Sequence, residues 1–487
     1  MPFQIVTLWT DRLIFLLLAA LIVFIVYVRR HEHLLQPWRK VAHSRAGMAA
    51  AVVLALFVSS GLLDSMHYRP RLPSDNPAAA PAYAVEARSV FDLIAGGLRE
   101  RTEKTYSSPL ATQLFSKETV ELPDGRKARE FPRLRYGGAH LQDPAVQWAG
   151  DVSRRAVAGV GIAVLLWNAI LALTTGWLAR RQRKGFGEMW RAIWSGGTMV
   201  RWREMLVTAG ALLLILCPLV VLSAKYHVFG TDKVGQDVFY LTLKSIRTGL
   251  VIGTLTTLVM LPFALLLGIM AGYFRGRIDD VIQYVYTTLN SSPAVLLIAA
   301  AILMTQAYMG THPDLFDTVQ QRQDMRLLFL CLILGVTSWT GLCRLLRGET
   351  LKLREMEYIQ AAQAFGVSDF RIITRHLLPN VMHIVLIAIV MDFSGLVLAE
   401  AVLSYVGVGV DPTMISFGNM INGARLEMAR EPMVWWSLAS AFVFMLLLVL
   451  TANLFADAVR DAFDPRIASR SATGGAFARL LPGVRGR

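Results

Sequence analysis

Two acidic residues are candidates for chemistry because they lie in otherwise apolar sequence. Asp392 precedes Glu400 by eight residues within the apolar stretch 381–402. Eight residues is a little over two helical turns, so both side chains can face the interior of a helix bundle. Ionisable groups inside a membrane are costly and tend to be functional or paired. We therefore name both as candidate pathway residues; that Glu400 only satisfies helix ends near the outer surface is an open alternative.

The sequence contains no motif for catalysis or nucleotide binding. The pattern G-x-x-x-x-G-K-[ST] is absent, so no such loop can cradle nucleotide phosphates. The nine histidines are scattered, and the three cysteines lie in apolar stretches without the paired spacing of a metal site or disulfide framework: Cys217, Cys331 and Cys343. We expect a chain that is not an enzyme and holds no metal or cofactor. Its energy must come from another polypeptide.

A polar segment at 357–379 is set between long apolar stretches and carries two short helical patterns. The first places two aromatic and two small residues on one helical face, at i, i+3, i+4 and i+7: Tyr358, Ala361, Ala362 and Phe365. Gly366 ends that helix, and Ser368 can cap a second one that runs to Pro379. Such a helix suits insertion into a groove on another protein. An ordinary solvated loop is the open alternative.

The composition identifies a membrane protein. Of 487 residues, 54% are hydrophobic and 17% are charged, and the mean hydropathy is +0.47. That is too apolar for a soluble chain of this length. The net charge of +14 comes from basic clusters beside apolar stretches, the positive-inside pattern. We therefore expect a lipid bilayer around the chain and no nucleic-acid partner.

Nine apolar stretches are long enough to cross the hydrocarbon core as helices. They lie near 13–28, 47–63, 155–178, 204–224, 248–272, 281–308, 326–346, 381–402 and 435–456. The loops after the first and third stretches are strongly basic, which places both in the cytoplasm. Alternation then places the N-terminus and residues 64–154 outside and residues 347–379 inside. The fold class is an all-α integral membrane protein.

The external segment 64–154 has mixed signals. Its prolines cannot propagate a helix: Pro70, Pro73, Pro77 and Pro81. An amphipathic pattern follows over 90–98, and Pro-Asp-Gly at 123–125 indicates a hairpin turn. A small α/β module is one interpretation and partial disorder is the other. For the second external stretch, 225–247, we favour a capped turn into the next helix over a role at the external mouth.

Glycine and proline predict how the later helices pack. Gly249 and Gly253, like Gly268 and Gly272, form small-xxx-small pairs that permit close helix approach in lipid. Pro262 and Pro293 are expected to interrupt their helices and to bend them near a pathway.

Four further motifs carry a resemblance to a known family. HVFGTDKVGQD at 227–237, AGYFRG at 271–276, LAEAVLSYVGVG at 398–409 and DAVRDAFDPR at 457–466 occur in that order, with the Ala361, Ala362, Gly366 and Leu378-Pro379 pattern between the second and third. Over about 204–466 the chain resembles the second-subunit type of the dipeptide/oligopeptide/nickel permeases of ABC importers. Gln360 stands where the family commonly has Glu, and His376 where Ile is frequent. The first departure puts in doubt any ion pair expected from that Glu.

The resemblance implies a type I ABC-importer transmembrane domain with about six core helices, preceded by about three extra N-terminal helices. The expected units are spans at 1–63, an external segment at 64–154, a third span and basic linker at 155–203, a permease core at 204–466 with its coupling loop at 347–379, and a cytoplasmic tail at 467–487. Tyr358, Ala361, Ala362, Phe365 and Gly366 would contact the ATPase.

The implied partners are a homologous permease, two ABC ATPase subunits that bind the ATP, and a periplasmic solute-binding protein, in a bacterial inner membrane. The cargo would be peptides or a similar small solute, with the solute itself left open. Two alternatives from other classes are an ion-gradient-driven secondary transporter using Asp392 and Glu400, and a non-transporting receptor that senses through 64–154.

Overall fold

The computed structural model describes residues 3–72, 83–121, 127–313, 316 and 318–463. In this part of the chain, nine helices are long and apolar enough to cross a membrane. They are α1 (Trp9–Arg30), α3 (Arg45–Asp64), α6 (Pro144–Gln182), α8 (Trp202–Ser223), α9 (Val238–Phe274), α11 (Ala294–Thr311), α12 (Val319–Arg354), α15 (Leu378–Tyr405) and α17 (Trp436–Phe463). Each overlaps one predicted span, so the expectation of nine spans in an all-α membrane protein is confirmed.

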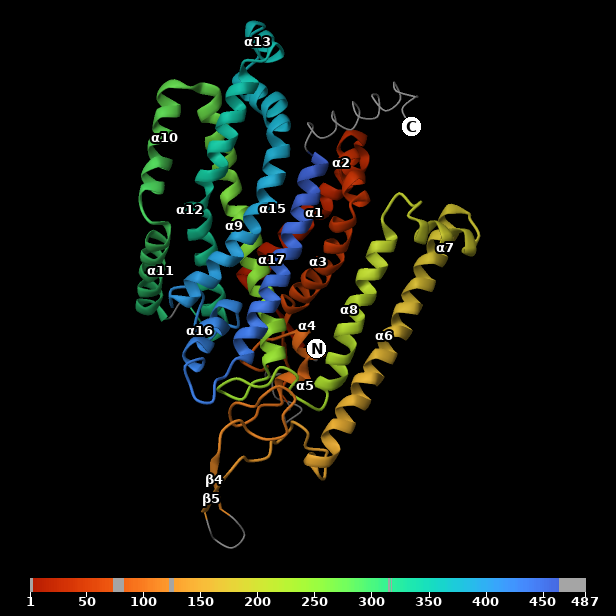
Figure 1. Cartoon of the computed structure of the whole chain (residues 1–487). Coiled ribbons are helices and arrows are strands. Elements are labelled where there is room, and N and C mark those ends of the chain that lie inside the picture. The colour runs from red at the N-terminus through yellow and green to blue at the C-terminus, as the bar shows by residue number, and fades with distance from the viewer. Residues whose placement is uncertain (1–2, 73–82, 122–126, 314–315, 317, 464–487) are drawn as a thin grey trace, which may run out of the picture.

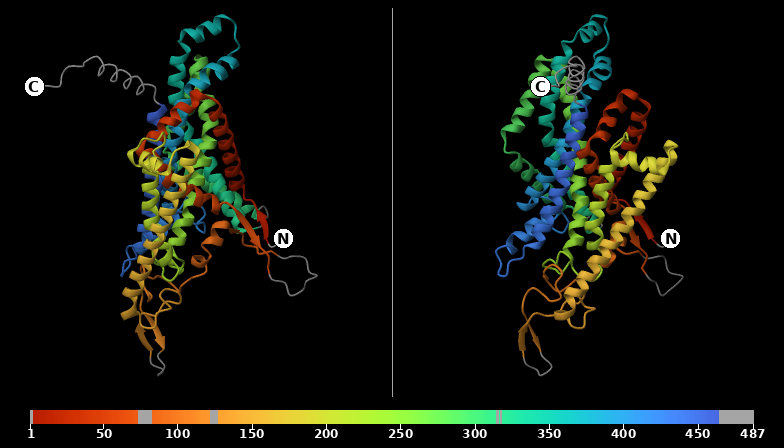
Figure 2. Two further views of the ribbon diagram at one scale, coloured as in Figure 1. Left: turned by 90° about the vertical axis from the view of Figure 1, so that its right-hand side faces the viewer. Right: turned by 45° about the vertical axis from the view of Figure 1, so that its right-hand side comes forward.

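Helices α9 and α12 form the centre of the bundle, while α6 and α8 stand side by side at one edge (Figures 1 and 2). Glycine allows α9 and α12 to approach closely. A Cβ atom added at Gly272 would lie 2.6 Å from the Thr350 Cβ and 2.8 Å from the Arg347 carbonyl oxygen, and one at Gly268 would meet the Cys343 backbone at 2.9 Å. The predicted packing role of this glycine pair is therefore confirmed.

Helix α9 starts earlier than predicted, which shortens the second external stretch. The side chain of Asp237 accepts hydrogen bonds from the backbone N–H of Phe239 at 2.9 Å and of Tyr240 at 3.3 Å, and so caps the helix. The preceding loop turns through Gly230 and Gly235, whose φ angles are +71° and +79°. The capped turn that we favoured for this stretch is what the structure shows.

The two predicted proline interruptions have different outcomes. The stretch expected as one span over 281–308 is two helices, α10 (Gly276–Ser291) and α11, separated by the extended residue Ser292 and by Pro293. Pro293 ends α10 because the residue before a proline is pushed out of the helical region. Pro262 lies inside continuous α9, so the prediction of an interruption there is wrong. Neighbouring helices in a bundle can compensate for the lost hydrogen bond.

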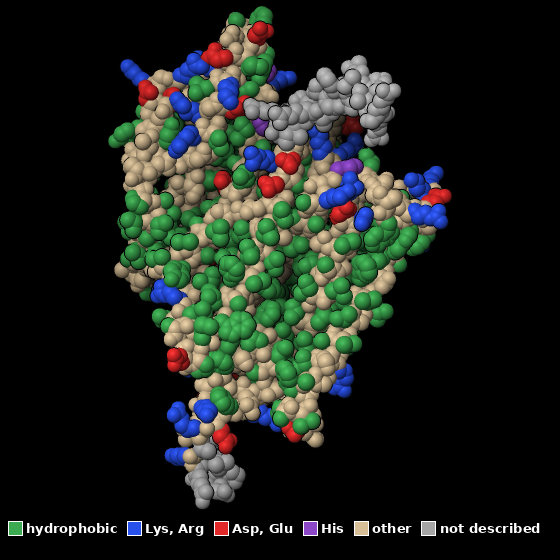
Figure 3. Space-filling model, viewed as in Figure 1, with side chains coloured by type: hydrophobic (Ala, Val, Ile, Leu, Met, Phe, Trp, Pro, Cys, Tyr) green, Lys and Arg blue, Asp and Glu red, His purple; other side chains and the backbone are tan. Residues whose placement is uncertain are grey.

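The loops expected in the cytoplasm lie at one end of the bundle. Helices α2 (Glu32–His43), α7 (Phe186–Ser195) and α13 (Glu357–Ala364) are all at the upper end in Figure 1. The external hairpin and the short helices α4 (Val90–Ile94) and α5 (Gly96–Arg99) are at the opposite end, as is α16 (Phe417–Glu427). A band of hydrophobic side chains covers the face between them, with many Lys and Arg side chains above it (Figure 3). This arrangement agrees with the predicted orientation.

The external segment is ordered into strands and short helices in its described residues. Strand β2 (His67–Pro70) pairs antiparallel with β1 (Phe3–Val6) and with β3 (Arg88–Ser89). The predicted hairpin is present as β4 (Glu118–Glu121) paired with β5 (Lys127–Glu130), although its expected turn at 123–125 lies outside the described residues, as do Pro73, Pro77, Pro81 and residues 464–487.

The amphipathic helix expected over 90–98 is broken between α4 and α5. Leu93 is 70% exposed and Ile94 is 68% exposed, whereas Leu98 packs against the hydrophobic cluster that contains Phe91 and Ala95, so only part of the predicted apolar face is buried. Apolar packing and polar contacts both anchor this segment.

Candidate functional site

The polar segment folds into a loop of short helices that projects from the cytoplasmic end of the bundle (Figure 1). Helix α13 is followed by α14 (Asp369–Ile372), a π-helical turn η2 (Ile373–Leu377) and α15. Gly366 has a φ of +70°, which fits its predicted place at the end of the first helix. Ser368 precedes α14 in an extended conformation, but its side chain makes no capping hydrogen bond.

The second helix of this loop does not stop at Pro379, contrary to our prediction. The chain stays helical from Asp369 to Tyr405, with Pro379 in the first turn of α15. In the π-helical turn, the Leu378 N–H bonds to the Ile373 carbonyl five residues back. Pro379 therefore lies inside a continuous helix, directly after the π-helical turn, and such a local π adjustment is one way in which a membrane helix accommodates a proline. The loop is consequently joined to a membrane-spanning helix without a break.

The structure divides the predicted docking face of α13 into two sides. Tyr358, Ala361 and Gly366 are exposed, and Phe365 is 87% exposed. Ala362 is half-buried and packs against the hydrophobic cluster at this end of the bundle, beside the fully buried Ile359. The outward surface therefore lacks Ala362 but gains an aromatic residue that the sequence reasoning missed, Phe370, which is 78% exposed. An aromatic residue between Asp369 and Arg371 in a polar stretch was the available signal.

Hydrogen bonds tie this loop to the cytoplasmic end of α9. The Tyr273 hydroxyl donates to Asp369 Oδ1 at 2.6 Å, and Gln363 Nε2 donates to the Tyr273 hydroxyl oxygen at 3.3 Å. Arg275 pairs with Glu355 at 2.5 Å between Nη2 and Oε1. Tyr273 and Arg275 belong to the AGYFRG motif, so that motif holds the loop in place. Gln360 donates to the Glu355 carbonyl oxygen at 3.3 Å and remains exposed.

The two candidate acids do not share a site. Glu400 is 1% exposed and accepts hydrogen bonds from Ser404 at 2.7 Å and from Ser416 at 3.0 Å, so it links α15 to the N-terminus of α16 at the outer end. Asp392 instead lines a cavity of about 700 Å³ between α12, α15 and α17. The remaining lining is mostly apolar; the residues are Ser338, Gly341, Leu342, Leu345, Glu349, His383, Ile384, Ile387, Ala388, Met391 and Arg460.

This cavity lies toward the cytoplasmic end of the bundle. Glu349 is near the end of α12, Arg460 is near the end of α17, and His383 is in the second turn of α15. The cavity therefore adjoins the helix that continues into the projecting loop. Among the described residues, no group of three or more His, Cys, Asp or Glu side chains could hold a metal ion.

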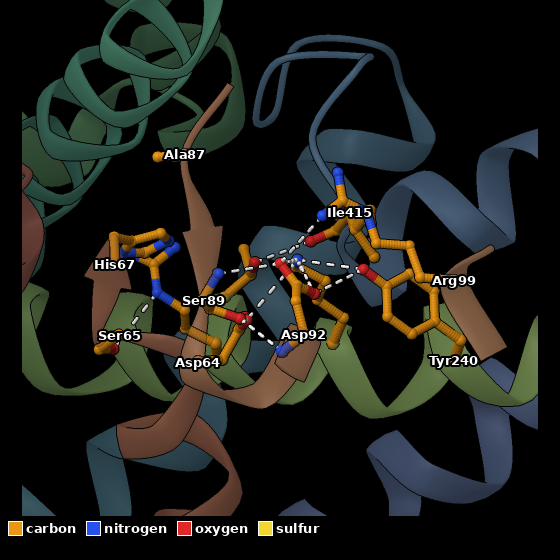
Figure 4. Close-up of polar contacts among 12 residues, drawn as sticks. Asp64, Ser65, His67, Ala87, Ser89, Asp92, Arg99, Tyr240 and Ile415 are labelled. Carbon is orange, nitrogen blue, oxygen red and sulfur yellow. Dashed lines mark hydrogen bonds and ion pairs between the residues drawn. The ribbon is translucent and has the colours of Figure 1, made fainter. Parts of the chain in front are cut away.

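A cluster of ion pairs at the outer end joins the N-terminal helices to the later ones. Asp92 accepts from Lys244 at 2.7 and 2.9 Å and from the Tyr240 hydroxyl at 2.7 Å, while Asp64 accepts from the Ser89 hydroxyl at 2.6 Å. Figure 4 shows these carboxylates converging beside Tyr240. Burial alone would raise the pKa of Asp92. The positive charge of Lys244 and the hydrogen bonds to Asp92 outweigh this effect and lower the pKa from 3.8 to about 2.

A second ion pair lies deeper in the same interface. Arg247 of α9 donates to Asp11 of α1 at 2.6 Å and to Thr10 at 3.2 Å, and Asp11 is fully buried. Asp11 also accepts a hydrogen bond from His67 at 2.8 Å if that ring nitrogen is protonated. The first two membrane helices, α1 and α3, are thus attached to α9 by buried carboxylates, Asp11 with Arg247 and Asp64 with Lys244. No local sequence pattern could have revealed partners so distant in the chain.

The described part of the chain is a polytopic membrane bundle with nine helices long enough to span and a structured polar loop at its cytoplasmic end. A family model described as "Binding-protein-dependent transport system inner membrane component" matches residues 264–469. The chain is 30% identical over 241 residues to the dipeptide transport system permease protein DppC of Bacillus subtilis (strain 168), which covers 50% of this chain and 69% of that protein.

The chain is also 34% identical over 245 residues to the oligopeptide transport system permease protein OppC of Mycobacterium bovis, covering 50% of this chain and 77% of that protein. Among solved structures, the inward-facing MetNI methionine ABC transporter aligns with 47% of this chain and 98% of the solved chain, at 16% identity and a TM-score of 0.37.

The chain belongs to the family of binding-protein-dependent transport system permeases, in its dipeptide/oligopeptide, second-subunit branch. It is the permease subunit of an ABC importer, a multi-pass protein of the bacterial inner membrane with a type I importer domain. Such a subunit works with ATPase and other permease subunits. The family model begins at residue 264, so the extra helices α1, α3 and α6 lie outside it.

Proposed function

We propose that this permease carries peptides inward as part of a complex with a homologous permease, two ABC ATPase subunits and a periplasmic solute-binding protein. The cargo is inferred from the named dipeptide and oligopeptide relatives. ATP binds to the partner subunits, and this chain contributes no cofactor of its own. Its membership in an ABC importer family favours this function over gradient-driven transport or solute sensing.

The observation that carries the proposal is the exposed aromatic surface of the projecting loop. Phe365 and Phe370 are 87% and 78% exposed at the cytoplasmic end, where an ATPase subunit has access. Two exposed phenylalanines within six residues are costly in water and are typical of a helix that inserts into a groove on a partner. Tyr358, Ala361 and Gly366 complete this outward surface, and Ala362 supports it from the inner side.

The connections of the loop supply a mechanism for coupling. When the ATPases close on ATP, they displace the projecting loop, which includes α13 and α14. Since the chain is helical without a break from Asp369 in α14 to Tyr405, the displacement of α14 passes into α15. The hydrogen bond from Tyr273 to Asp369 passes it to α9 as well. Helix α15 lines the cavity that contains Asp392, so its movement changes access to that cavity. The complex then switches between inward-open and outward-open states by rigid-body motion.

The test is co-purification of the tagged chain in mild detergent, comparing the native protein with Phe365→Asp. We expect a nucleotide-hydrolysing subunit to co-purify with the native chain and its recovery to fall at least tenfold in the variant, because a charge in an apolar groove loses the contact and pays for desolvation. Phe131→Asp is the matched control, since Phe131 is 44% exposed at the external end. Equal recovery from both variants would show that the loop is not the ATPase contact.

A further inference from the structure

The cavity between α12, α15 and α17 has one acidic group that the described part of the fold does not use. Asp392 makes no hydrogen bond or ion pair with any residue in the described part of the chain, although its side chain is partly buried. By contrast, the other buried acids of the helices have partners: Asp11 has Arg247, and Glu400 has two serine hydroxyls. Asp392 is therefore not explained as a structural group.

Asp392 lies in the middle of the apolar stretch 381–402 of α15. It is 14 residues after Leu378, which is about 21 Å along the helix from the projecting loop. Most of the side chains that line the cavity are apolar, among them Leu342, Ile387 and Met391, and Ser338 adds a hydroxyl group. A carboxylate in such surroundings is costly when it has no partner.

We propose that Asp392 binds the ammonium group of the solute as it passes through this cavity; the proposal rests on the proposed function of the chain as an importer. The solute class is then one with a free cationic amine, such as a peptide with an unblocked N-terminus. The cavity of about 700 Å³ falls in the range of small-molecule sites, about 300 to 1,000 Å³.

The cytoplasmic rim of the cavity carries a complementary charge in Arg460. His383 lines the same rim and is nine residues before Asp392, about 13 Å along α15. An extended peptide spans at most about 3.3 to 3.6 Å per residue, so about four residues reach from Asp392 to this rim. The other rim charge, Glu349, already accepts from Lys352 at 3.1 Å. A short peptide can thus place its amine at Asp392 and its carboxylate near Arg460.

The experiment places a thiol beside Asp392 through Met391→Cys, since Met391 lines the same cavity and is 48% exposed. In inverted membrane vesicles containing the whole importer, one measures how fast this thiol reacts with a cationic and with an anionic methanethiosulfonate reagent. The parent chain with its native cysteines gives the background rate. The measurement is repeated with Asp392→Asn added and with the matched control Asp457→Asn, whose residue is exposed at the cytoplasmic end of α17.

We expect the ratio of cationic to anionic rates to fall about tenfold in Asp392→Asn and to stay unchanged in Asp457→Asn, because a nearby negative charge attracts one reagent and repels the other. Trialanine at millimolar concentration should slow the reaction, N-acetyl-trialanine should not, and the Asp392→Asn change should abolish the protection. Equal protection by the two peptides, or an unchanged rate ratio, overturns the proposal.

The failure of the proposed function would look different. If the native complex does not take up peptide in an ATP-dependent manner, the importer function assigned to it fails. The reagent ratio would still report the charge of Asp392, so the two results separate the claims.

Discussion

The strongest test of the architecture concerns His227, which lies between two carboxylates where the external segment meets α9. Its Nδ1 is 2.7 Å from Asp237 Oδ2 and its Nε2 is 3.3 Å from Glu103 Oε1. His227 and both acids are almost fully buried. A carboxylate only accepts hydrogen bonds, so both ring nitrogens must carry protons for both contacts to form. The geometry therefore requires a charged imidazolium.

The pKa shifts give the size of this interaction. Burial alone would lower the pKa of His227, but the hydrogen bonds to Asp237 and Glu103 and their charges outweigh it and raise the pKa from 6.5 to about 9. A shift of this size corresponds to about 3 kcal/mol. Because the folded pKa is the higher one, this stabilisation is complete below about pH 6.5 and is lost as the pH rises through 9.

The pKa of Glu103 shifts in the opposite direction to that of His227. Burial alone would raise its pKa, but the hydrogen bonds from His227 and from the backbone N–H groups of Arg135, Tyr136 and Gly137 lower it from 4.5 to about 2. Its contribution is present above pH 4.5 and is lost only as the pH falls through 2. Of these two contributions, only that of His227 should change between pH 6 and pH 10. The two contributions share one contact and do not add.

The assay is hydrogen–deuterium exchange of the purified chain at pH 6 and pH 10, with rates corrected for intrinsic exchange. Peptides covering 100–115 and 225–237 should lose about a hundredfold in protection at the higher pH, the equivalent of about 3 kcal/mol. Glu103→Gln should destabilise this contact by about 1 to 2 kcal/mol at pH 6, since one of the two charges facing His227 is removed.

Glu118→Gln is the matched control, because Glu118 pairs with Lys104, whose side chain is 73% exposed, and exposed pairs contribute little. If protection of both peptides is the same at pH 6 and pH 10, or if Glu103→Gln behaves like Glu118→Gln, the charged contact between the external segment and α9 is not what holds them together.

Two further predictions concern the packing of the bundle. Arg247→Leu should lower the yield of folded chain in a fluorescence-detected size-exclusion assay, because it leaves the fully buried carboxylate of Asp11 unpaired at a cost of about 3 to 5 kcal/mol. Adding Asp11→Leu should restore much of the yield. If the double variant shows no recovery, the result argues against the pair. Gly272→Leu should separate α9 from α12 and lower the thermal stability in the same assay, since even a Cβ atom at this position would lie 2.6 Å from the Thr350 Cβ. Gly341→Ala should be neutral, because the space around Gly341 is open. Equal stability of the two variants would contradict the close approach of the helices.

Much of the fold follows from local sequence. Nine apolar stretches and two basic loops predicted the nine helices and their orientation, because transfer into lipid depends on composition within a window of about 20 residues. The periodicity from Tyr358 to Phe365 predicted the first helix of the coupling loop, and Gly366 its end. The errors fell where a helix depends on its neighbours, as at Pro262 and at Pro379.

The candidate site was only partly visible in the sequence. Spacing placed Asp392 and Glu400 on helical turns that can face one interior, yet the structure turns Asp392 to a cavity and buries Glu400 against two serines. Helical periodicity repeats every 3.6 residues and says which residues share a side of one helix. It does not say which other helix that side meets, so it could not separate an unpaired acid from a satisfied one.

The sequence by itself determined that this chain is a membrane permease with nine spans, because hydropathy, charge bias and short motifs are properties of neighbouring residues. Only the tertiary structure decided which charges are paired. Arg247 with Asp11, Lys244 with Asp92 and His227 with Glu103 join segments more than 100 residues apart. Such pairs form only when distant helices pack against each other, and their packing leaves Asp392 without a partner among the described residues, in the cavity between α12, α15 and α17.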